Sequence, residues 1–408
     1  MNNQRLELVA DFYEYTMANG YFNKNMQDRI AYFDVFFRKV PDEGGYAIVA
    51  GLEQIINYIR NLSFDEEDIS YLRKQNKFSE EFLNYLENFR FTGDIWAIPE
   101  GTVVFPNEPL ITVKAPIIQA QLLETMLLLT TNHQSLIATK TSRIVKEAQG
   151  RPVMEFGARR AHGINAAVEG ARAAIIGGAV GTSCTLSAKE FNVPASGTMA
   201  HSWIQSFDSE YEAFKAYAEL YPDDCTFLID TYNTIESGLP NAIKVFNEVL
   251  KPKGYRPKAV RLDSGDLAYL SKKVRKILDE AGYEDCKICA TNSLDEYLIK
   301  SLIEQDAKID LFGVGENLIT AKSEPVFGGV YKLVALEKDK KIVPKIKVSE
   351  NTAKVTNPSF KKVYRFYDNE TKKAIADVIT LADEIIDERE YMIFDPQNPW
   401  KKKVLKDY

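Results

Sequence analysis

Seven short apolar runs in the middle of the chain are each followed at once by residues that can do chemistry. These residues are Arg159 and Arg160, Ser183, His201, Asp230, Asp263 and Asp266, Asn292, and the run Gly313-Val314-Gly315-Glu316. Ordinary surface loops favour Lys and Glu, which are nearly absent here. Arginines pair with carboxylates and phosphates, acids bind hydroxyls or Mg²⁺, and histidine can act as a nucleophile. The pattern predicts one active site for an anionic substrate.

The tightest cluster of charged residues follows the run that contains Arg261. Asp263-Ser264-Gly265-Asp266 places two carboxylates on a glycine turn. Both acids could hold Mg²⁺ or sugar hydroxyls, because hard oxygen ligands suit that ion. Alternatively, Ser264 or Asp266 caps a helix predicted over residues 267–281. The two roles are compatible, but capping alone does not require Arg261 and Asp263.

The glycines of the last run point to a phosphate. Gly313 and Gly315 form only a weak dinucleotide motif, because the third glycine of that motif is missing. A glycine-rich turn after a late barrel strand nevertheless suits a 5′-phosphate, which bare backbone N–H groups and a helix N-terminus can bind.

The elements that must position these residues alternate between strands and helices. Strands are predicted at residues 153–157, 179–183, 198–202, 226–230, 259–263, 288–292 and 311–315. Helical patterns are predicted at residues 161–176, 209–220, 241–250, 267–281 and 294–304. Strand–helix units in series favour an α/β fold built on an irregular parallel (β/α) barrel, complete or incomplete, with the site at the carboxyl ends of the strands. An open doubly wound sheet is the alternative.

The rest of the chain predicts a second, α+β domain. Residues 1–120 mix helical and strand patterns, and residues 326–408 return to short strands with Lys-rich turns. We therefore expect an N-terminal domain over 1–120, a catalytic barrel over 121–325, and a C-terminal segment, 326–408, that packs back on the N-terminal domain.

Composition narrows the class of protein. The 408 residues carry 51 Lys and Arg against 58 Asp and Glu, a net charge of −7, which opposes binding to nucleic acid or an anionic membrane. The start of the chain lacks the apolar core of a secretory signal, and the apolar stretches are too short to cross a bilayer. Of the four cysteines only Cys286 and Cys289 are close, and because a zinc site would need a second such pair, these two are expected to be reduced structural thiols. We expect a cytoplasmic protein.

Several motifs in order resemble those of the nicotinate phosphoribosyltransferases. They are Glu155-Phe-Gly-Ala-Arg-Arg-Ala-His162, Pro194-Ala-Ser-Gly-Thr-Met-Ala-His-Ser202, Val260-Arg-Leu-Asp-Ser-Gly-Asp266, Asp11-Phe-Tyr-Glu-Tyr-Thr-Met17 and Pro99-Glu-Gly-Thr-Val-Val-Phe-Pro106. The resemblance, from Leu8 to Tyr331, implies the type II phosphoribosyltransferase fold and a homodimer with shared active sites. It implies that nicotinate and 5-phosphoribosyl 1-pyrophosphate give nicotinate mononucleotide and pyrophosphate in NAD biosynthesis.

The resemblance also implies roles for the residues that would bind nicotinate. Phe156 supplies one aromatic face, and Tyr13 of the other subunit supplies the second. Arg159 and Arg261 contact the carboxylate or the substrate phosphates. Without the motif context, core packing would be the simpler role for Phe156 and Tyr13.

Further implied roles concern the sugar, the phosphates and ATP. Asp263 binds the ribose hydroxyls, Asp230 is a weaker candidate for Mg²⁺ or its water shell, and Asn292 adds a hydrogen bond. Gly313 and Gly315 bind the ribose phosphate. The histidine of the second motif, His201, is phosphorylated by ATP as co-substrate, and hydrolysis of the phosphohistidine drives the synthesis.

Ser183 bears on the choice of substrate. The related family that uses nicotinamide carries an aspartate near this position, which would repel the carboxylate of nicotinate. An amide-using enzyme of the same fold is therefore the first alternative. A phosphate-binding aldolase or isomerase would need a lysine at a strand end, and none is found. A non-catalytic scaffold would not need so many Arg, His and Asp residues at one edge.

Overall fold

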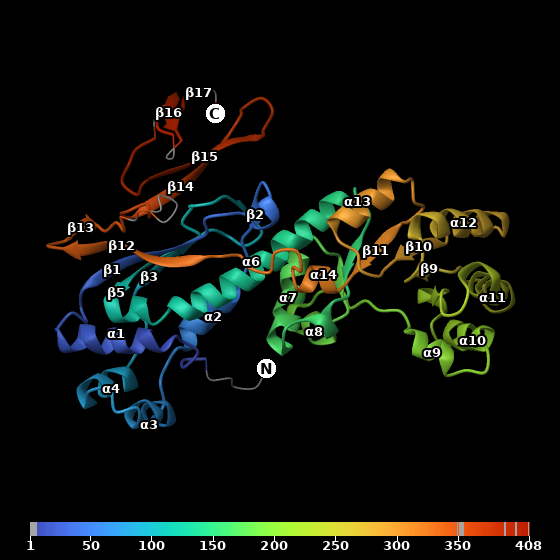
Figure 1. Ribbon diagram of the computed structural model, residues 1–408, viewed down its shortest axis with the longest axis horizontal. Coiled ribbons are helices and arrows are strands. Elements are labelled where there is room, and N and C mark those ends of the chain that lie inside the picture. Colours follow the sequence, from blue (N-terminus) through green and yellow to red (C-terminus); the bar gives the residue numbers. More distant parts are fainter. Residues whose placement is uncertain (1–5, 349, 351–354, 387–388, 396–397, 407) are drawn as a thin grey trace. The chain divides into compact units, whose positions relative to one another are not determined.

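The computed structural model describes residues 6–348, 350, 355–386, 389–395, 398–406 and 408, and divides into two compact units (Figure 1). Unit 1 comprises Met1–Asn132 and Phe327–Tyr408, and unit 2 comprises His133–Val326. The sequence predicted boundaries after residues 120 and 325. The first division instead falls within helix α6 (Glu124–Glu147).

Unit 1 is built on a five-stranded antiparallel sheet in the order β13-β12-β1-β5-β3. Its central strand reads Ile-Ala-Tyr-Phe-Asp-Val-Phe and is buried at all but its first residue, as expected for a strand with both faces covered. The strands of the sheet are β1 (Ile30–Phe36), β3 (Asp94–Ala97), β5 (Ile111–Pro116), β12 (Val330–Lys338) and β13 (Lys341–Pro344). Strand β12 pairs with β1, so the C-terminal region completes the N-terminal sheet.

Helices and small sheets surround this sheet in unit 1. The helices are α1 (Phe12–Asn23), α2 (Leu52–Asn61), α3 (Glu66–Lys74), α4 (Glu80–Glu87) and α5 (Ile117–Gln121). The paired short strands are β2 (Ala47–Ile48) with β4 (Val103–Val104), β14 (Lys361–Tyr367) with β15 (Ala374–Leu381), and β16 (Glu390–Phe394) with β17 (Lys402–Lys406). In Figure 1, α1, α3 and α4 lie below the sheet and the hairpins β14–β15 and β16–β17 lie above it.

Unit 2 is an incomplete parallel barrel. Its six-stranded sheet has the order β7-β6-β11-β10-β9-β8 and curls in Figure 1, and across the described residues its end strands β7 and β8 do not pair. The strands are β6 (Val153–Glu155), β7 (Gly181–Thr182), β8 (Thr226–Leu228), β9 (Ala259–Leu262), β10 (Lys287–Ala290) and β11 (Leu311–Val314). The predicted fold class is confirmed, in its incomplete form.

The helices of unit 2 follow the strands along the chain. They are α7 (Ile164–Ile176), α8 (Thr185–Phe191), α9 (His201–Gln205), α10 (Glu210–Leu220), α11 (Leu239–Val245), α12 (Leu267–Glu280), α13 (Glu296–Glu304) and α14 (Glu316–Ile319). All five helices predicted from apolar periodicity are present, as α7 and α10 to α13. Single π-helical turns, at 234–238 and 246–250, flank α11.

The strand predicted at residues 198–202 is wrong. The chain makes only an isolated parallel bridge between Thr182 and Ala195, and helix α9 begins at His201. The segment before α9 contains Pro194 and Gly197, which disfavour a regular ladder. Ile204, within this helix, is completely buried. His201 therefore starts a helix rather than ending a strand.

A buried ion pair joins the β14–β15 hairpin of unit 1 to its central sheet. Lys361 Nζ on β14 lies 2.7 Å from Asp34 Oδ2 on β1, and their side chains are 5% and 2% exposed. The Thr112 hydroxyl also donates to Asp34, over 2.6 Å. Burial raises the pKa of Asp34, and the Lys361 ammonium opposes that shift. The two charges are desolvated together and depend on each other.

Removing one partner of this ion pair should destabilise unit 1 strongly. Asp34→Ala would leave the Lys361 ammonium buried without its counter-charge, which costs about 3–5 kcal/mol. Urea unfolding followed by circular dichroism measures this loss. The matched control is Arg73→Ala, which breaks the exposed Arg73–Glu80 pair and should leave the midpoint unchanged. Equal midpoints for the two variants would contradict the role of the buried pair.

Candidate active site

The carboxyl ends of the six parallel strands of unit 2 lie at one edge of the curled sheet, here called the strand-end site (Figure 1). Parallel pairing puts equivalent ends side by side: Leu262 lies opposite Ala290, and Val314 lies opposite Glu155. The residues that follow these strands therefore meet, as the sequence predicted.

Arg261 is held within a dense hydrogen-bond network. Its Nε donates to the Thr291 hydroxyl over 3.0 Å, and its Nη2 donates to Asp263 Oδ1 over 3.1 Å. Its Nη1 donates to the Thr198 hydroxyl over 3.0 Å and to the Met199 carbonyl over 3.3 Å. All three nitrogens are thus engaged, and the guanidinium joins the ends of β9 and β10 to the segment before α9.

Asp230 occupies the end of β8 and connects three further groups. Its side chain is 2% exposed, and Oδ1 lies 3.3 Å from His201 Nε2. Its Oδ2 accepts the backbone N–H of Asp263 over 2.9 Å and the Ser264 hydroxyl over 2.5 Å. The carboxylate therefore orients the histidine and fixes the turn after β9. The His201 side chain itself is 39% exposed.

The two candidate metal acids differ in what they can still bind. Both oxygens of Asp230 are engaged, so it does not fit as a direct metal ligand. Asp263 Oδ1 accepts from Arg261 and Thr291, but its Oδ2 has no partner among the residues described. Asp266 caps α12 by accepting the Tyr269 N–H over 3.0 Å, which confirms the capping alternative.

The described residues of the strand-end site do not form a metal site made of protein ligands alone. In the described part of the chain, no group of three or more His, Cys, Asp or Glu residues is placed to share a metal ion. Mg²⁺ usually keeps several waters and binds one or two carboxylates together with substrate phosphates. The free oxygen of Asp263 suits that second arrangement.

Phe156 lies against the backbone of β11. Its N–H donates to the Val314 carbonyl over 2.7 Å. A methyl group added at Gly313 would lie 2.6 Å from Phe156 Cδ2 and 2.8 Å from Thr291 Cγ2. Gly313 is buried within β11, so the close approach of the Phe156 ring, rather than a phosphate, accounts for the glycine. Gly315 precedes α14 and lies next to the Phe156 carbonyl, and its phosphate role stays a prediction.

The two arginines after β6 are exposed on the short turn 158–160. Arg160 forms a loose pair with Glu316, with 3.9 Å between Nε and Oε2. Arg159 has neither a hydrogen bond nor an ion pair within the described ranges of the chain. Its guanidinium is free to bind an anion, whereas that of Arg261 is held by protein groups.

Ser183 and Asn292 are both exposed at strand ends. The Ser183 N–H donates to the Glu155 carbonyl over 2.9 Å, which places the serine beside the end of β6. Asn292 has φ 79° and Ser293 has φ 52°, so this turn adopts the left-handed conformation at two successive non-glycine residues. Asn317 stabilises it by donating to the Ser293 carbonyl over 2.8 Å. Such strain is typical of binding sites.

Tyr13 belongs to unit 1, at the start of α1, and its side chain is exposed. Burial, together with the neighbouring carboxylate of Glu124, raises the pKa of Tyr13. The phenol therefore stays protonated at neutral pH and hydrogen-bonds Glu124. Its stacking on a substrate stays a prediction.

Four residues of the site were not assigned roles by sequence reasoning. Thr198 and Thr291 are hydroxyl partners of Arg261, and Glu155 and Thr182 bond each other over 2.6 Å at the ends of β6 and β7. Threonine is a common strand residue, so its hydroxyl gave no signal. Glu155 was a usable signal, because an acid at the end of an apolar strand needs partners.

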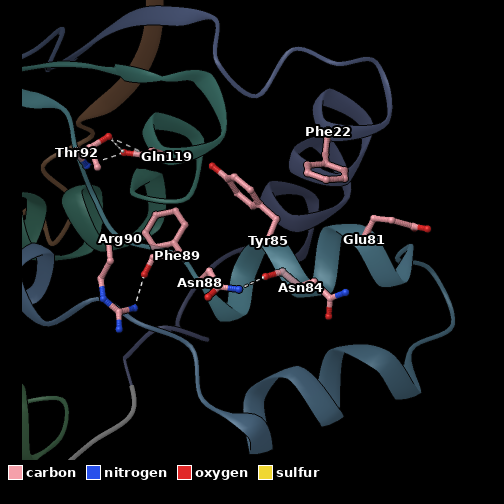
Figure 2. A pocket seen from close by; sticks show the side chains of 9 residues that line it. All are labelled: Phe22, Glu81, Asn84, Tyr85, Asn88, Phe89, Arg90, Thr92 and Gln119. Atoms are coloured by element: carbon pink, nitrogen blue, oxygen red, sulfur yellow. Dashed lines mark hydrogen bonds between the residues drawn. The ribbon is translucent and has the colours of Figure 1, made fainter.

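A separate cavity of about 530 Å³ lies in unit 1, between α1, α4 and the segment after α4 (Figure 2). Its lining includes Phe22, Tyr85 and Arg90, but none of the predicted site residues. Two of its amides are occupied by neighbours: Gln119 accepts from Thr92, and the Asn88 side chain donates to the Asn84 carbonyl, as Figure 2 shows. The cavity lacks the combination of acids, arginine and histidine found at the strand ends, so we take the strand-end site as the candidate active site.

Two predictions about the chain as a whole can be compared with the structure. The four cysteines, at positions 184, 225, 286 and 289, are free thiols. Burial raises the pKa of Cys225, Cys286 and Cys289 to about 12, so these thiols are unreactive at neutral pH. None of the helices described has the length and apolar character needed to span a membrane.

Family models match nearly the whole chain. The nicotinate phosphoribosyltransferase (NAPRTase) family model matches residues 152–380, the NAPRTase N-terminal domain matches 8–132, and the nicotinate phosphoribosyltransferase C-terminal domain matches 360–408. The nicotinate phosphoribosyltransferase of Bacillus subtilis (strain 168) is 46% identical over 404 residues, which cover 99% of this chain and 82% of the relative. The Homo sapiens enzyme of that name is 30% identical over 436 residues, covering 92% and 80%.

Solved structures show the same architecture. The crystal structure of human nicotinic acid phosphoribosyltransferase superposes with a TM-score of 0.84 at 27% identity, covering 98% of this chain and 86% of that one. A nicotinate-nucleotide pyrophosphorylase from Pyrococcus furiosus shares the fold, with a TM-score of 0.74 at 24% identity, covering 100% and 90%. With the strand-end geometry, these matches confirm the resemblance found in the motifs: the chain belongs to the nicotinate phosphoribosyltransferase family and is an enzyme of that type.

Proposed function

We propose that the strand-end site joins nicotinate to 5-phosphoribosyl 1-pyrophosphate, giving nicotinate mononucleotide and pyrophosphate for NAD synthesis, with ATP consumed through a phosphohistidine at His201. One observation carries the proposal. Contacts run without a break from Phe156 through Gly313 and Thr291 to Asp263, and from there to Asp230 and His201. An aromatic face, a free carboxylate oxygen and a nucleophilic imidazole thus belong to one site.

The nicotinate end of the site would be built on Phe156 and Arg159. The Phe156 ring lies close to Gly313, and one of its faces would bind a flat pyridine ring. The unpaired guanidinium of Arg159, three residues along the chain, suits a carboxylate, which it can bind through two parallel hydrogen bonds. Because Arg261 is already engaged, we assign the carboxylate to Arg159 and give Arg261 substrate contacts only through its remaining N–H.

The sugar and its phosphates would bind on the other side of the strand ends. Asp263 Oδ2 would accept a ribose hydroxyl, while Gly315 would bind the 5′-phosphate and Asn292 would add a hydrogen bond. The pyridine nitrogen attacks the anomeric carbon as the bond to pyrophosphate breaks, so positive charge develops on the ribose. Holding the two reactants in line supplies much of the rate enhancement. Mg²⁺ carried by the pyrophosphate would offset the negative charge of the leaving group.

His201 would carry the phosphoryl group from ATP. Asp230 lies beside Nε2, and Nδ1 has no hydrogen-bond partner among the residues described, so Nδ1 is the nitrogen available to accept phosphate. The buried carboxylate stabilises the positive charge that forms as the ring reacts. Hydrolysis of the phosphohistidine would then draw the equilibrium toward nicotinate mononucleotide.

A second copy of the chain would complete the site, as in the predicted homodimer. Tyr13 is exposed on α1, and Val9, Phe12 and Met17 around it are exposed apolar residues. Apolar side chains gathered in this way favour burial against another protein surface. We propose that Tyr13 of one subunit faces Phe156 of the other across the nicotinate ring, in a cytoplasmic enzyme.

Removing the imidazole should abolish the effect of ATP. His201→Ala is expected to retain slow synthesis of nicotinate mononucleotide, because the binding residues remain, but to lose stimulation by ATP. The assay follows product formation with and without ATP, together with ³²P incorporation into the protein. His162→Ala, which removes an exposed histidine outside the network, serves as the control. Undiminished stimulation or labelling of His201→Ala would refute the phosphohistidine.

A carboxylate at position 183 should repel nicotinate. Ser183→Asp would place a second negative charge near that of the substrate. The repulsion between two such charges is about 1–4 kcal/mol at 4 Å, which raises the KM for nicotinate roughly fivefold to several hundredfold. Ser183→Ala, which adds no charge, should change the KM far less. A KM for nicotinate that is the same in the aspartate and alanine variants would show that Ser183 does not face the carboxylate.

A methyl group at Gly313 should displace the Phe156 ring. In Gly313→Ala the added carbon lies 2.6 Å from Cδ2 of that ring, which must move. A shift of about 1 Å in a positioning group typically costs up to about a hundredfold in rate, so we expect kcat/KM for nicotinate to fall at least about tenfold. Gly45→Ala, where no atom lies within 4 Å, is the steric control. Equal kinetics for the two variants would exclude Phe156 from the site.

A further inference from the structure

Glu155 is a completely buried acid at the end of β6, immediately before Phe156. One carboxylate oxygen, Oε1, accepts the backbone N–H of Gly157. The other, Oε2, accepts the Thr182 hydroxyl over 2.6 Å. The side chain therefore touches both of the chain segments that carry the proposed nicotinate residues, the turn after β6 and the loop after β7.

Thr182 extends the contact into the loop that contains Ser183. Its hydroxyl oxygen accepts the Cys184 N–H over 2.9 Å, and the Ser183 N–H donates to the backbone carbonyl of Glu155 over 2.9 Å. Ser183 is thus held at its own N–H by the Glu155 carbonyl, and both of its chain neighbours, Thr182 and Cys184, bond through the Thr182 hydroxyl.

The turn after β6 is held from its other side by α14. A methyl group added at Gly157 would lie 2.6 Å from Ile319 Cβ and 2.8 Å from Glu155 Oε1, so the backbone is packed between them. Phe156 and Arg159 flank this glycine in sequence. The positions of the Phe156 ring and the Arg159 guanidinium therefore depend on the hydrogen bond that Glu155 accepts from Gly157.

The environment of Glu155 is costly for an acid. Within the described residues it has no cationic partner, and burial raises the pKa of its carboxyl while the bonds from Thr182 and Gly157 oppose that shift. An apolar residue would fill the space without this desolvation cost. An apolar residue, however, could not accept hydrogen bonds from two separate loops, as Glu155 does.

We propose that Glu155 is a positioning residue that holds the Phe156–Arg159 turn and the Ser183 loop in one fixed relation, and so sets the affinity for the pyridine carboxylate. The inference rests on the proposed function, since it concerns the same site. It assigns to Glu155 and Thr182 a role in recognising the base, separate from the sugar and ATP chemistry at Asp263 and His201.

Three variants separate positioning from simple stability. Glu155→Ala removes both hydrogen bonds. Glu155→Gln keeps the bond from Gly157, because the amide oxygen accepts it, and reverses the other bond, because the NH₂ group donates to the Thr182 oxygen. Thr182→Val removes the hydroxyl, and with it the bonds to Glu155 and to the Cys184 N–H, with little change of shape. Glu169→Ala is the matched control, because Glu169 is another acid of unit 2 whose pKa is raised by burial, but it lies on α7 and bonds Gln134.

Steady-state kinetics are measured with each substrate varied in turn, and unfolding is followed in urea. Losing a buried hydrogen bond costs enough that Glu155→Ala should raise the KM for nicotinate about tenfold or more, with the KM for phosphoribosyl pyrophosphate within about twofold of the wild type. Glu155→Gln should restore the wild-type value. Thr182→Val should show a smaller rise, and the double variant Glu155→Ala/Thr182→Val should be no worse than Glu155→Ala alone. Glu169→Ala should leave both constants unchanged.

Two outcomes would overturn the inference. One is an unchanged KM for nicotinate in Thr182→Val and Glu155→Ala, whatever their stability. The other is an equal rise in both Michaelis constants. If Glu155→Ala fails to fold, Thr182→Val decides, because it only replaces one hydroxyl by a methyl group. Wild-type turnover is measured first: its absence would refute the proposed function and the inference with it, whereas turnover with unchanged variants would refute the positioning role alone.

Discussion

The carboxylate of Asp230 is the group on which the geometry of the strand-end site depends. It lies at the end of β8, almost fully buried, and it accepts from the backbone of Asp263 and the hydroxyl of Ser264 while facing His201. A buried carboxylate must satisfy its oxygens or lose several kcal/mol, so these partners are held tightly. One charge thereby sets the turn after β9 and the orientation of the imidazole together.

The two arginines at the strand ends serve different purposes, because protein groups hold the guanidinium of one and leave that of the other free. The nitrogens of Arg261 donate hydrogen bonds to protein groups and connect the end of β9 to the end of β10 and to the segment before α9. Arg159 stands on a short exposed turn and keeps its guanidinium free. A chain of net charge −7 can therefore bind anions, because its positive charge is concentrated locally and only part of it is neutralised.

The parts of this arrangement that follow from local pattern could be predicted from the sequence. Alternating strand and helix periods predicted the parallel units, and the polar residues after each strand predicted where Arg261, Asp263 and Asp230 would meet. Periodicity could not show that the third run, residues 198–202, is not a strand and that a helix begins at His201, because contacts far apart in sequence bear on that choice. Nor could it show that Gly313 serves the Phe156 ring, or that Thr291 and Glu155 bond across strands, since these contacts join residues far apart in sequence.

The central claim is that the strand ends form a site for nicotinate and phosphoribosyl pyrophosphate. Its most direct test is a competition assay in which the purified protein receives equal amounts of nicotinate and nicotinamide with phosphoribosyl pyrophosphate, Mg²⁺ and ATP, and both mononucleotides are quantified. We predict nicotinate mononucleotide and pyrophosphate in equal amounts, with little nicotinamide mononucleotide. A product that is mainly nicotinamide mononucleotide, or no product from either base, would contradict the account.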